Sequence, residues 1–449
     1  MKIKLDIPIT LSEIAGCTGG SLSSADDTIS CICTDSREVS QGDLFIAIRG
    51  ERIDGNLFAS EAHARGGYVI GTNGADITVY DAQTPILKLV NLYKCKLPCL
   101  LHTVAITGSV GKTTTKELVR CILSAKYNVH STYENFNNHI GLLHTVLSAK
   151  KDTEVLVVEL GMNHSGEISR LSRALVPDIA LITNIGTAHI GNLGSREAIA
   201  TAKLEVSDGM NSGTLIVPRD ESLLNPDTRC TVSFNSYGGD FALFIGDTNE
   251  RKTVFDFVGR NLTLESESVA LKGPHLMRAL GFALSVADIL ELHADDVRLA
   301  LKSVNESSLR QKRFTMGKYD IYDDTYSSSP EAAIAVMEAL TQQYPGKISA
   351  VLGDMLELGE RSIDLHRMVG RSAVEHNICK LYLFGDFAMA TAEGALAAGM
   401  PSNRIFINDN ASNLEYTAEQ IRCSYDDEVL IVKASHALRA ERLFDFLKD

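Results

Sequence analysis

The residues with the clearest chemical meaning form the segment Thr107-Gly108-Ser109-Val110-Gly111-Lys112-Thr113-Thr114. An apolar run, residues 100–106, precedes it, and apolar residues at helical spacing follow over 118–123. A strand, a glycine-rich turn and a helix are the context that a phosphate-binding loop requires. In such a loop, backbone N–H groups surround phosphate oxygens, and the helix N-terminus adds a partial positive charge. The segment therefore predicts a phosphate site.

Each residue of this loop has an expected role. Lys112 would reach the β- and γ-phosphates of a nucleotide, and the hydroxyl of Thr113 would hold Mg²⁺. The longer form of the motif has glycine where this chain has Ile106, so the match is to a shorter form. A chance Gly-Lys-Thr beside a strand is the alternative. The expected nucleotide-binding residues of the loop are Gly108, Ser109, Val110, Gly111, Lys112, Thr113 and Thr114.

Two further residues stand where strands are expected to end. Glu159 follows the apolar run 155–158, and His189 lies just after the apolar run 179–185. In open α/β sheets, ligands bind outside the carboxyl ends of the strands, and a carboxylate there can reach Mg²⁺. Glu159 is expected to be a metal ligand rather than a helix cap or a solvated glutamate. For His189, a metal ligand and a structural histidine remain equally open.

Lys203 and a group of asparagines are less informative on their own. Lys203 lies on an expected helix over 195–206, and its sequence context favours an ordinary exposed lysine. Asn135, Asn137 and Asn138 are typical of a turn. They would also supply neutral amide donors near phosphate or acyl oxygens.

Length and composition restrict the class of protein. The 449 residues suggest about three domains. A hydrophobic content of 45% and a charged content of 22% are typical of a globular protein. The net charge of −14 disfavours nucleic acid and anionic lipid as partners. The N-terminus lacks an export signal, and no apolar run approaches the roughly 20 residues that span a bilayer. The nine cysteines are not spaced as in a disulfide framework, so we expect reduced thiols. We therefore expect a cytoplasmic protein, and no membrane partner.

The pattern of apolar runs predicts three α/β domains, at 1–100, 101–312 and 313–449. The middle domain should contain a mostly parallel sheet, because its strands are continuous apolar runs separated by helical patterns. A polar, β-rich stretch over 228–270 and a helix over 274–291 should follow. The last domain repeats the α/β alternation, and Ser329-Pro330 should begin a helix. The expected strands are residues 154–160, 178–185, 214–217, 348–352, 381–384, 404–407 and 429–432.

Taken in order along nearly the whole chain, these segments resemble the Mur ligase family, the ATP-dependent amide-forming enzymes of peptidoglycan synthesis. Within that family the chain is most similar to members that add D-alanyl-D-alanine to a UDP-N-acetylmuramoyl tripeptide. Besides the loop, the matching segments are Thr34-Asp35-Ser36-Arg37, Gly42-Asp43-Leu44-Phe45, Arg49-Gly50, Asn135-Phe136-Asn137-Asn138, Glu159-Leu160-Gly161-Met162-Asn163-His164, Asn184-Ile185-Gly186-Thr187-Ala188-His189, Ala202-Lys203, Asp323-Asp324-Thr325-Tyr326, Gly353-Asp354-Met355-Leu356-Glu357-Leu358-Gly359 and Lys433-Ala434-Ser435.

The resemblance implies roles that spacing alone does not provide. It implies a small UDP-sugar-binding domain, a central ATPase domain and a Rossmann-like ligase domain. It implies ATP and two Mg²⁺ ions, with Lys203 carbamylated by CO₂ to act as a metal ligand. Lys112, Lys203 and His189 would be catalytic. The implied metal ligands are Thr113, Glu159, His189 and Lys203. The resemblance implies two further nucleotide contacts, Asn138 and Asp324. The implied substrate contacts are Thr34, Asp35, Ser36, Arg37, Arg49, Asn135 and Asn184.

The implied partners are a UDP-sugar peptide and a dipeptide, and the protein is expected to be a monomer. Two alternatives remain open: a related ligase for another carboxylate and amine, and a catalytically silent nucleotide-binding protein. Departures from the family pattern keep the first alternative open. Asparagines expected near adenine are replaced, as is the glycine of a Lys-Gly-Ser segment. The substituted positions are Leu276, Ala279, Ser327, Ser329 and Ala434.

Overall fold

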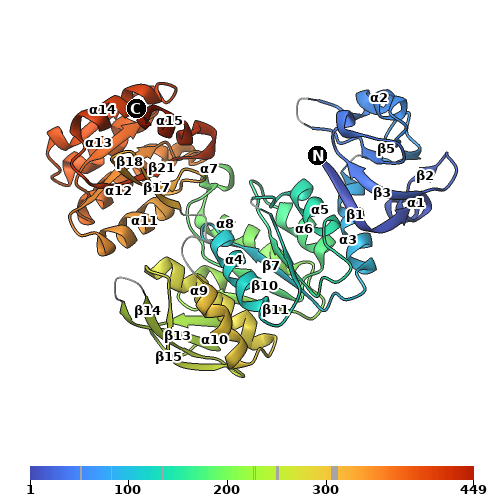
Figure 1. Ribbon diagram of the computed structural model, residues 1–449, viewed down its shortest axis with the longest axis horizontal. Helices are drawn as coiled ribbons and strands as arrows, with labels where there is room; N and C mark the ends of the chain where they lie inside the picture. Colours follow the sequence, from blue (N-terminus) through green and yellow to red (C-terminus); the bar gives the residue numbers. More distant parts are fainter. Residues whose placement is uncertain are drawn as a thin grey trace. The chain divides into compact units, whose positions relative to one another are not determined.

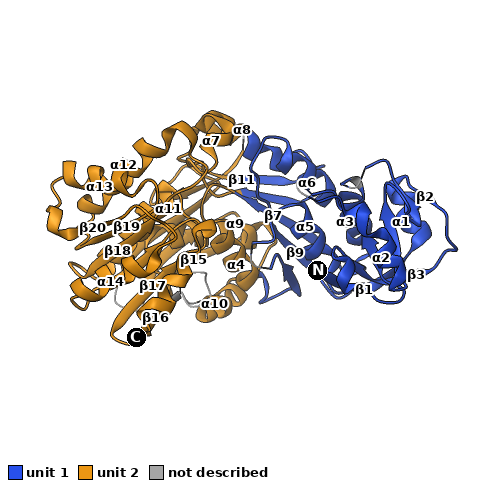
Figure 2. Ribbon diagram, turned by 90° about the horizontal axis from the view of Figure 1, so that it is seen from above, with its two compact units in different colours: residues 1–107, 123–181, 202–216 blue, residues 108–122, 182–201, 217–449 orange. Residues whose placement is uncertain are grey.

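The computed structural model describes residues 1–50, 53–81, 83–133, 135–225, 227, 229–248, 252–304 and 312–448. Two compact units make up the chain, as coloured in Figure 2. Unit 1 contains residues 1–107, 123–181 and 202–216, and unit 2 contains residues 108–122, 182–201 and 217–449. The expected domain boundary near 312 adjoins residues 305–311, which lie outside the described residues.

Unit 1 begins with a six-stranded sheet in the order β1-β3-β4-β5-β6-β2. The strand β1 alternates buried and exposed residues along its first half, with Ile3 and Leu5 on the buried face. This alternation is typical of a strand with one face on a core. The bounds are β1 Lys2–Thr10, α1 Leu11–Thr18, β2 Ser21–Leu22, β3 Thr28–Cys33, β4 Leu44–Ile46, α2 Ala59–Ala64, β5 Tyr68–Gly71, β6 Ile77–Thr78 and α3 Thr84–Lys96.

The rest of unit 1 contains the parallel strands β10, β7, β9 and β8, adjacent in that order. Every residue of β9 is buried, which explains its continuous apolar sequence. The helix α3 packs against α5 and α6, and α5 also contacts β9. The bounds are β7 His102–Thr107, β8 Val129–Ser131, α5 His139–Leu147, β9 Val155–Glu159, α6 Glu167–Leu175, β10 Ile179–Ile182 and β11 Thr214–Pro218, which pairs with β10 in parallel.

Unit 2 opens with the helix α4 after the glycine-rich loop. Farther along, β13 pairs with β12 in parallel and with β14 antiparallel, and β14 pairs with β15 antiparallel. Figure 1 shows α9 and α10 beside these strands. The bounds are α4 Lys112–Leu123, α7 Ile190–Leu193, α8 Arg196–Leu204, β12 Cys230–Phe234, β13 Phe241–Thr248, β14 Thr253–Val258, β15 Thr263–Val269, α9 Pro274–Ile289 and α10 Ala294–Ser303.

The C-terminal part of unit 2 is a sheet in the order β16-β17-β21-β18-β19-β20. Only the β16/β17 pair is antiparallel. One face packs on α14 and α15 through a core that includes Val351, Ile421, Leu430 and Leu443. The bounds are β16 Lys312–Met316, β17 Tyr319–Asp324, α11 Pro330–Gln343, β18 Ile348–Gly353, α12 Ser362–Glu375, β19 Leu381–Phe384, α13 Ala388–Ala397, β20 Ile405–Asn408, α14 Leu414–Ser424, β21 Val429–Lys433 and α15 Leu443–Leu447.

The predicted α/β class with mostly parallel sheets is confirmed. The helix at Ser329-Pro330 begins as expected, since the Ser329 hydroxyl accepts a hydrogen bond from the backbone of Ala332. The strand expected over 178–185 ends earlier, at Ile182. The strands β1, β3, β16 and β17 were not predicted. Within the described part of the chain, the helices are too short or too polar to traverse a bilayer.

Candidate active site

The glycine-rich loop connects β7 to α4 and depends on two glycines. Gly108 has a φ of +149°, and a Cβ there would lie 1.9 Å from the Thr183 hydroxyl oxygen. Gly111 has a φ of +80° and open space where a side chain would be. Side-chain-bearing residues rarely adopt positive φ. Gly108 thus allows the loop to pack closely against Thr183. Gly111 leaves the backbone accessible beside the N-terminus of α4.

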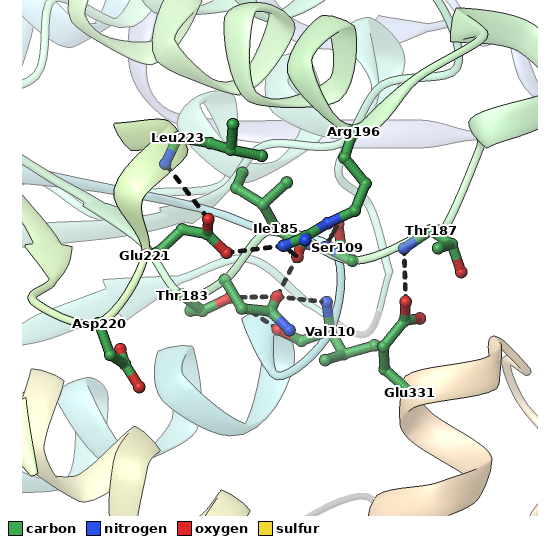
Figure 3. A network of polar contacts seen from close by, with 12 residues as sticks. Ser109, Val110, Thr183, Ile185, Thr187, Arg196, Asp220, Glu221, Leu223 and Glu331 are labelled. Carbon is green, nitrogen blue, oxygen red and sulfur yellow. Dashed lines mark hydrogen bonds and ion pairs between the residues drawn. The ribbon is translucent and has the colours of Figure 1, made fainter. Parts of the chain in front are cut away.

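The segment 183–186 holds this loop in place (Figure 3). The Oδ1 atom of Asn184 accepts hydrogen bonds from the backbone of Ser109 (3.1 Å) and Val110 (2.9 Å). The Thr183 hydroxyl donates to the Val110 carbonyl at 2.6 Å. The Gly186 N–H donates to the Ser109 hydroxyl at 2.9 Å. The side-chain oxygen of Asn184 thus shapes the loop, and the substrate role expected for Asn184 from the sequence stays a prediction.

Lys112 is the first residue of α4, and its side chain bends back over the loop. Its Nζ atom donates to the carbonyls of Gly108 (2.9 Å) and Ser109 (3.3 Å). The first N–H groups of a helix have no acceptor within that helix. Lys112 and the start of α4 therefore bring a full and a partial positive charge to the same place, which is an arrangement suited to phosphate.

A third contact secures the segment that supports the loop. Arg196, on α8, donates from Nη2 to the Ile185 carbonyl and to the Glu221 carboxylate, both at 2.9 Å (Figure 3). Glu221 in turn accepts from the Leu223 backbone. The loop thus rests on a connected polar network, and its shape is set before any ligand arrives.

Glu159 ends β9 and is paired in register with Ile106 of β7, directly before residues 107–114. Its side chain is only 2% exposed, and its Oε1 atom accepts from the Asn137 amide at 2.9 Å. Gly161 lies so close to Asn137 that a Cβ would approach the Asn137 side chain to 2.8 Å. A buried carboxylate at this strand end is suited to binding a cation.

Lys203 is buried, with 2% exposure, on the last turn of α8. The sequence alone favoured an exposed lysine, and the structure corrects that expectation. Burying an ammonium is costly unless it is paired or neutralised. Lys203 is therefore not an ordinary solvated lysine, and its role as a metal ligand stays a prediction.

His189 lies directly before α7 with a φ of +65°. Its Nδ1 atom hydrogen-bonds to the carboxylate of Glu357, which follows β18. Two residues earlier, the Thr187 N–H donates to the carboxylate of Glu331 at 2.7 Å (Figure 3). Two carboxylates from the C-terminal part of unit 2 thus contact the segment 187–189. Sequence analysis quoted Glu357 within a motif but gave neither glutamate a role.

The proposed metal ligands are of mixed type. No group of three or more His, Cys, Asp and Glu side chains suited to a metal ion occurs among the described residues. The ligands expected from the sequence are not such a group, because Thr113 would contribute a hydroxyl and Lys203 a carbamate. Magnesium in nucleotide sites commonly takes one or two carboxylates and completes its shell with phosphates and water. The buried carboxylate of Glu159 fits that preference.

Just after β3 in unit 1, each of four predicted substrate residues has a hydrogen-bond partner. Arg37 donates twice to the Asp35 carboxylate, at 2.9 and 2.6 Å, and this guanidinium holds the Asp35 pKa well below its usual range. The Ser36 hydroxyl donates to Glu61 at 2.7 Å. The Thr34 N–H donates to the Met1 carbonyl. These contacts explain a fixed turn after β3, and the substrate role of the four residues stays a prediction.

A cavity of about 520 Å³ lies within unit 1. Arg49 and Arg170 line it, and neither guanidinium forms an ion pair within the described part of the chain. Sequence analysis did not select Arg170, because the residues around it in α6 form no motif that indicates a binding site. The remaining lining residues are Ile48, Gly50, Gln83, Leu87, Asn137, Asn138, His139, Ile140, Gly161, Met162, Asn163, Glu167 and Leu171.

The other predicted residues have structural partners. The Asn138 side chain caps α5 by accepting from the Gly141 N–H, while Asn135 is exposed and does not line the cavity. Asp324 accepts from the buried Lys433 ammonium at 2.7 Å. Leu276 and Ala279, the substituted positions on α9, are buried.

Comparison with known proteins places this arrangement in a family. The model described as "Mur ligase family, catalytic domain" matches residues 28–92, "Mur ligase middle domain" matches 106–276, and "Mur ligase, glutamate ligase domain" matches 310–436. The UDP-N-acetylmuramoyl-tripeptide--D-alanyl-D-alanine ligase of Bacillus subtilis is 33% identical, covering 97% of each chain. The Escherichia coli protein of that name is 28% identical over 86% of this chain and 89% of its own.

Solved structures agree with the sequence matches. A crystal structure of MurF from Acinetobacter baumannii has a TM-score of 0.86 at 27% identity, covering 100% of both chains. The MurF ligase of Thermotoga maritima in complex with ADP has a TM-score of 0.77 at 30% identity, covering 93% of this chain and 96% of its own. The chain belongs to the Mur ligase family. It is an ATP-dependent ligase that forms amide bonds.

Proposed function

We propose that this chain joins D-alanyl-D-alanine to the carboxylate of a UDP-N-acetylmuramoyl tripeptide, with ATP converted to ADP and phosphate. The observation that carries the proposal is the 33% identity to a ligase of that name along 97% of both chains. The preformed phosphate loop supports it, because a carboxylate is a poor electrophile until ATP activates it.

The residues at the loop suit the acyl-phosphate chemistry that the family resemblance implies. The substrate carboxylate attacks the γ-phosphate, the bond to the β-phosphate breaks, and an acyl phosphate and ADP result. The amine of the dipeptide then attacks the acyl carbon, a proton leaves the nitrogen, and phosphate departs. Lys112 neutralises charge that develops on the transferring phosphoryl group. The N–H groups at the start of α4 orient the same phosphates.

Thr113, Glu159, His189 and a carbamylated Lys203 would hold the two Mg²⁺ ions that we propose. When bound, Mg²⁺ would neutralise negative charge on the phosphates of ATP. For the carbamate, the neutral Nζ of Lys203 attacks CO₂, an N–C bond forms, and the nitrogen loses a proton. The buried position of Lys203 near the end of α8 supports a role other than that of an ordinary solvated lysine.

We assign the muramoyl peptide to the cavity in unit 1. Its two arginines form no ion pair with the residues that the structure describes, and they offer guanidinium groups to phosphate or carboxylate oxygens. Arg49, which sequence analysis selected, and Arg170 would make these contacts. Asn137 lines the same cavity and bonds to Glu159, so the cavity adjoins a proposed metal ligand. Asn138, Asn163 and the backbone of Gly161 add polar groups to the wall.

We also propose three domains with boundaries near 100 and 312, supported by the three family matches at 28–92, 106–276 and 310–436. The first would bind the UDP part of the substrate, the second ATP, and the third the incoming amine. Asp324 would contact the ribose of ATP, in competition with its bond to Lys433.

One assay separates this function from its alternatives. Phosphate release should require ATP, UDP-N-acetylmuramoyl tripeptide and D-alanyl-D-alanine together, and a pentapeptide product should appear by mass spectrometry. Release with the tripeptide and a different amine would indicate a related ligase. Nucleotide binding without any turnover, across a panel of UDP-muramoyl peptides and amines, would indicate a silent nucleotide-binding protein.

A further inference from the structure

The bond between His189 and Glu357 determines which ring nitrogen of His189 carries the proton. An ionised carboxylate has no proton to donate, so the Nδ1 atom of His189 must be the donor in this contact. In a neutral imidazole, the other nitrogen, Nε2, then keeps its lone pair. That lone pair is what a metal ligand requires.

The backbone around the pair is built to bring the two side chains together. His189 and Glu357 both have left-handed backbones, with φ values of +65° and +64°. Residues other than glycine adopt this conformation uncommonly. The Gly191 N–H donates to the Glu357 carbonyl at 2.9 Å, next to the side-chain contact.

Two glycines permit this approach. A Cβ on Gly191 would lie 2.5 Å from the backbone nitrogen of Gly359, and a Cβ on Gly359 would lie 2.7 Å from the Gly191 Cα atom. The two backbones therefore touch one another beside the His189–Glu357 bond. A surface ion pair of two mobile side chains would need no such backbone fit.

We propose that Glu357 is a positioning residue for His189. Its carboxylate holds the proton on Nδ1 and fixes the ring, so that Nε2 is presented to the metal. Metal-binding histidines usually donate their second ring N–H to a carboxylate or carbonyl, and loss of that partner weakens metal binding. Since Glu357 follows β18 in the C-terminal sheet, metal affinity at His189 then depends on the docking of that part of the chain.

This inference rests on the proposed role of His189 as a metal ligand, and the experiment tests the two separately. Mn²⁺ replaces Mg²⁺ as a paramagnetic probe, and its binding to the full-length protein with saturating ADP is measured by electron paramagnetic resonance. Glu357→Ala should weaken Mn²⁺ binding about 10- to 100-fold. Glu357→Gln, whose amide oxygen still accepts a hydrogen bond, should recover part of the loss.

The matched control is Glu360→Ala, an exposed glutamate on the same turn that makes no ion pair within the described residues. It should bind Mn²⁺ as the wild type does. His189→Ala should weaken binding at least as much as Glu357→Ala. Unchanged binding by His189→Ala would remove His189 from the ligands, and the inference with it. Unchanged binding by Glu357→Ala alone would overturn only the positioning role.

A second measurement does not involve metal. Nitrogen-15 NMR of histidine-labelled protein reports which ring nitrogen is protonated, and the His189 signals are assigned by their loss in His189→Ala. The wild type should carry the proton on Nδ1, and Glu357→Ala should shift it toward Nε2. A wild-type proton on Nε2, or a Glu357→Ala variant that keeps the proton on Nδ1 yet loses Mn²⁺, would contradict the proposal.

Discussion

The ammonium of Lys112 is held by two carbonyl oxygens of its own loop, at 2.9 and 3.3 Å. Both of these contacts lie within the loop, and they place the charge beside the N-terminus of α4, where phosphate would bind. We therefore expect Lys112→Ala to fold normally and to lose on the order of 10²–10³ in kcat, as when one transition-state charge contact is removed. Phosphate release measures kcat, and circular dichroism checks the fold.

Lys88→Ala is the control for Lys112→Ala, because Lys88 is exposed on α3. It should keep wild-type kcat. A folded Lys112→Ala protein with near-normal turnover would remove the assignment of residues 107–114 as a catalytic phosphate loop.

Lys203 gives the second prediction at this scale. If it acts as a carbamate, Lys203→Ala should lose activity that short-chain carboxylates such as acetate partly restore, because they can occupy the vacated ligand position. Lys203→Arg should not recover activity, since a guanidinium does not form the carbamate. The measurement is phosphate release with increasing acetate, and added chloride at equal ionic strength is the control. Wild-type turnover in either variant would return Lys203 to a structural role.

Residue types and local spacing revealed the loop, Glu159 and the position of His189. They could not reveal partners that lie far away in the sequence. Asn184 supports Val110 across 74 positions, and Glu357 bonds to His189 across 168 positions. Arg170, on α6, lines the cavity together with residues 48–50, which follow β4 more than a hundred positions earlier in the sequence. Such contacts belong to the tertiary structure, and a single sequence does not contain them.

At the scale of elements, the apolar pattern located most central strands but not where they end. The run 178–185 reads as one strand, yet β10 ends at Ile182. The next residues turn toward the phosphate loop because their polar groups bond to it. Local propensity favours a longer strand, and tertiary hydrogen bonds override it.

The turn after β18, which contains Glu357, depends on a buried histidine. His366 on α12 accepts the Met355 N–H at its Nε2 atom (3.0 Å) and donates from Nδ1 to the Ser362 carbonyl (2.7 Å). Both bonds require the neutral ring. Burial lowers the pKa of His366 below its ordinary value.

The unfolded chain therefore takes up this proton first as the pH falls. The contribution of His366 to the free energy of unfolding is complete above about pH 6.5, and it decreases as the pH falls from there through the folded-state pKa. We expect the urea midpoint to fall over this range, and the fall to be smaller in His366→Gln. His376→Gln, at the end of the same helix, is the control. Equal pH dependence in His366→Gln and the wild type would contradict this assignment.

At the scale of the whole molecule, length indicated about three domains, and the pattern of apolar runs indicated α/β structure with mostly parallel sheets. Composition indicated an acidic protein, with a net charge of −14. The net charge of the whole chain does not predict the charge at one binding site. The cavity in unit 1 holds two arginines without ion pairs among the described residues, in a chain whose surface as a whole repels anions.

The proposed substrate is anionic, so long-range repulsion and local attraction act on it together. Charges farther away than about 8–10 Å are largely screened at about 0.1–0.15 M salt, whereas guanidiniums in contact with the ligand are screened much less.

Replacing Arg49 and Arg170 by glutamine should therefore raise the KM for the UDP-muramoyl tripeptide by about tenfold or more for each. The KM for ATP should stay unchanged. In the wild type, raising the ionic strength from about 0.01 to 0.1 M should lower the tripeptide KM. Arg173→Gln, also on α6 but outside the cavity wall, is the control. An unchanged tripeptide KM in the double variant would move the substrate to another surface.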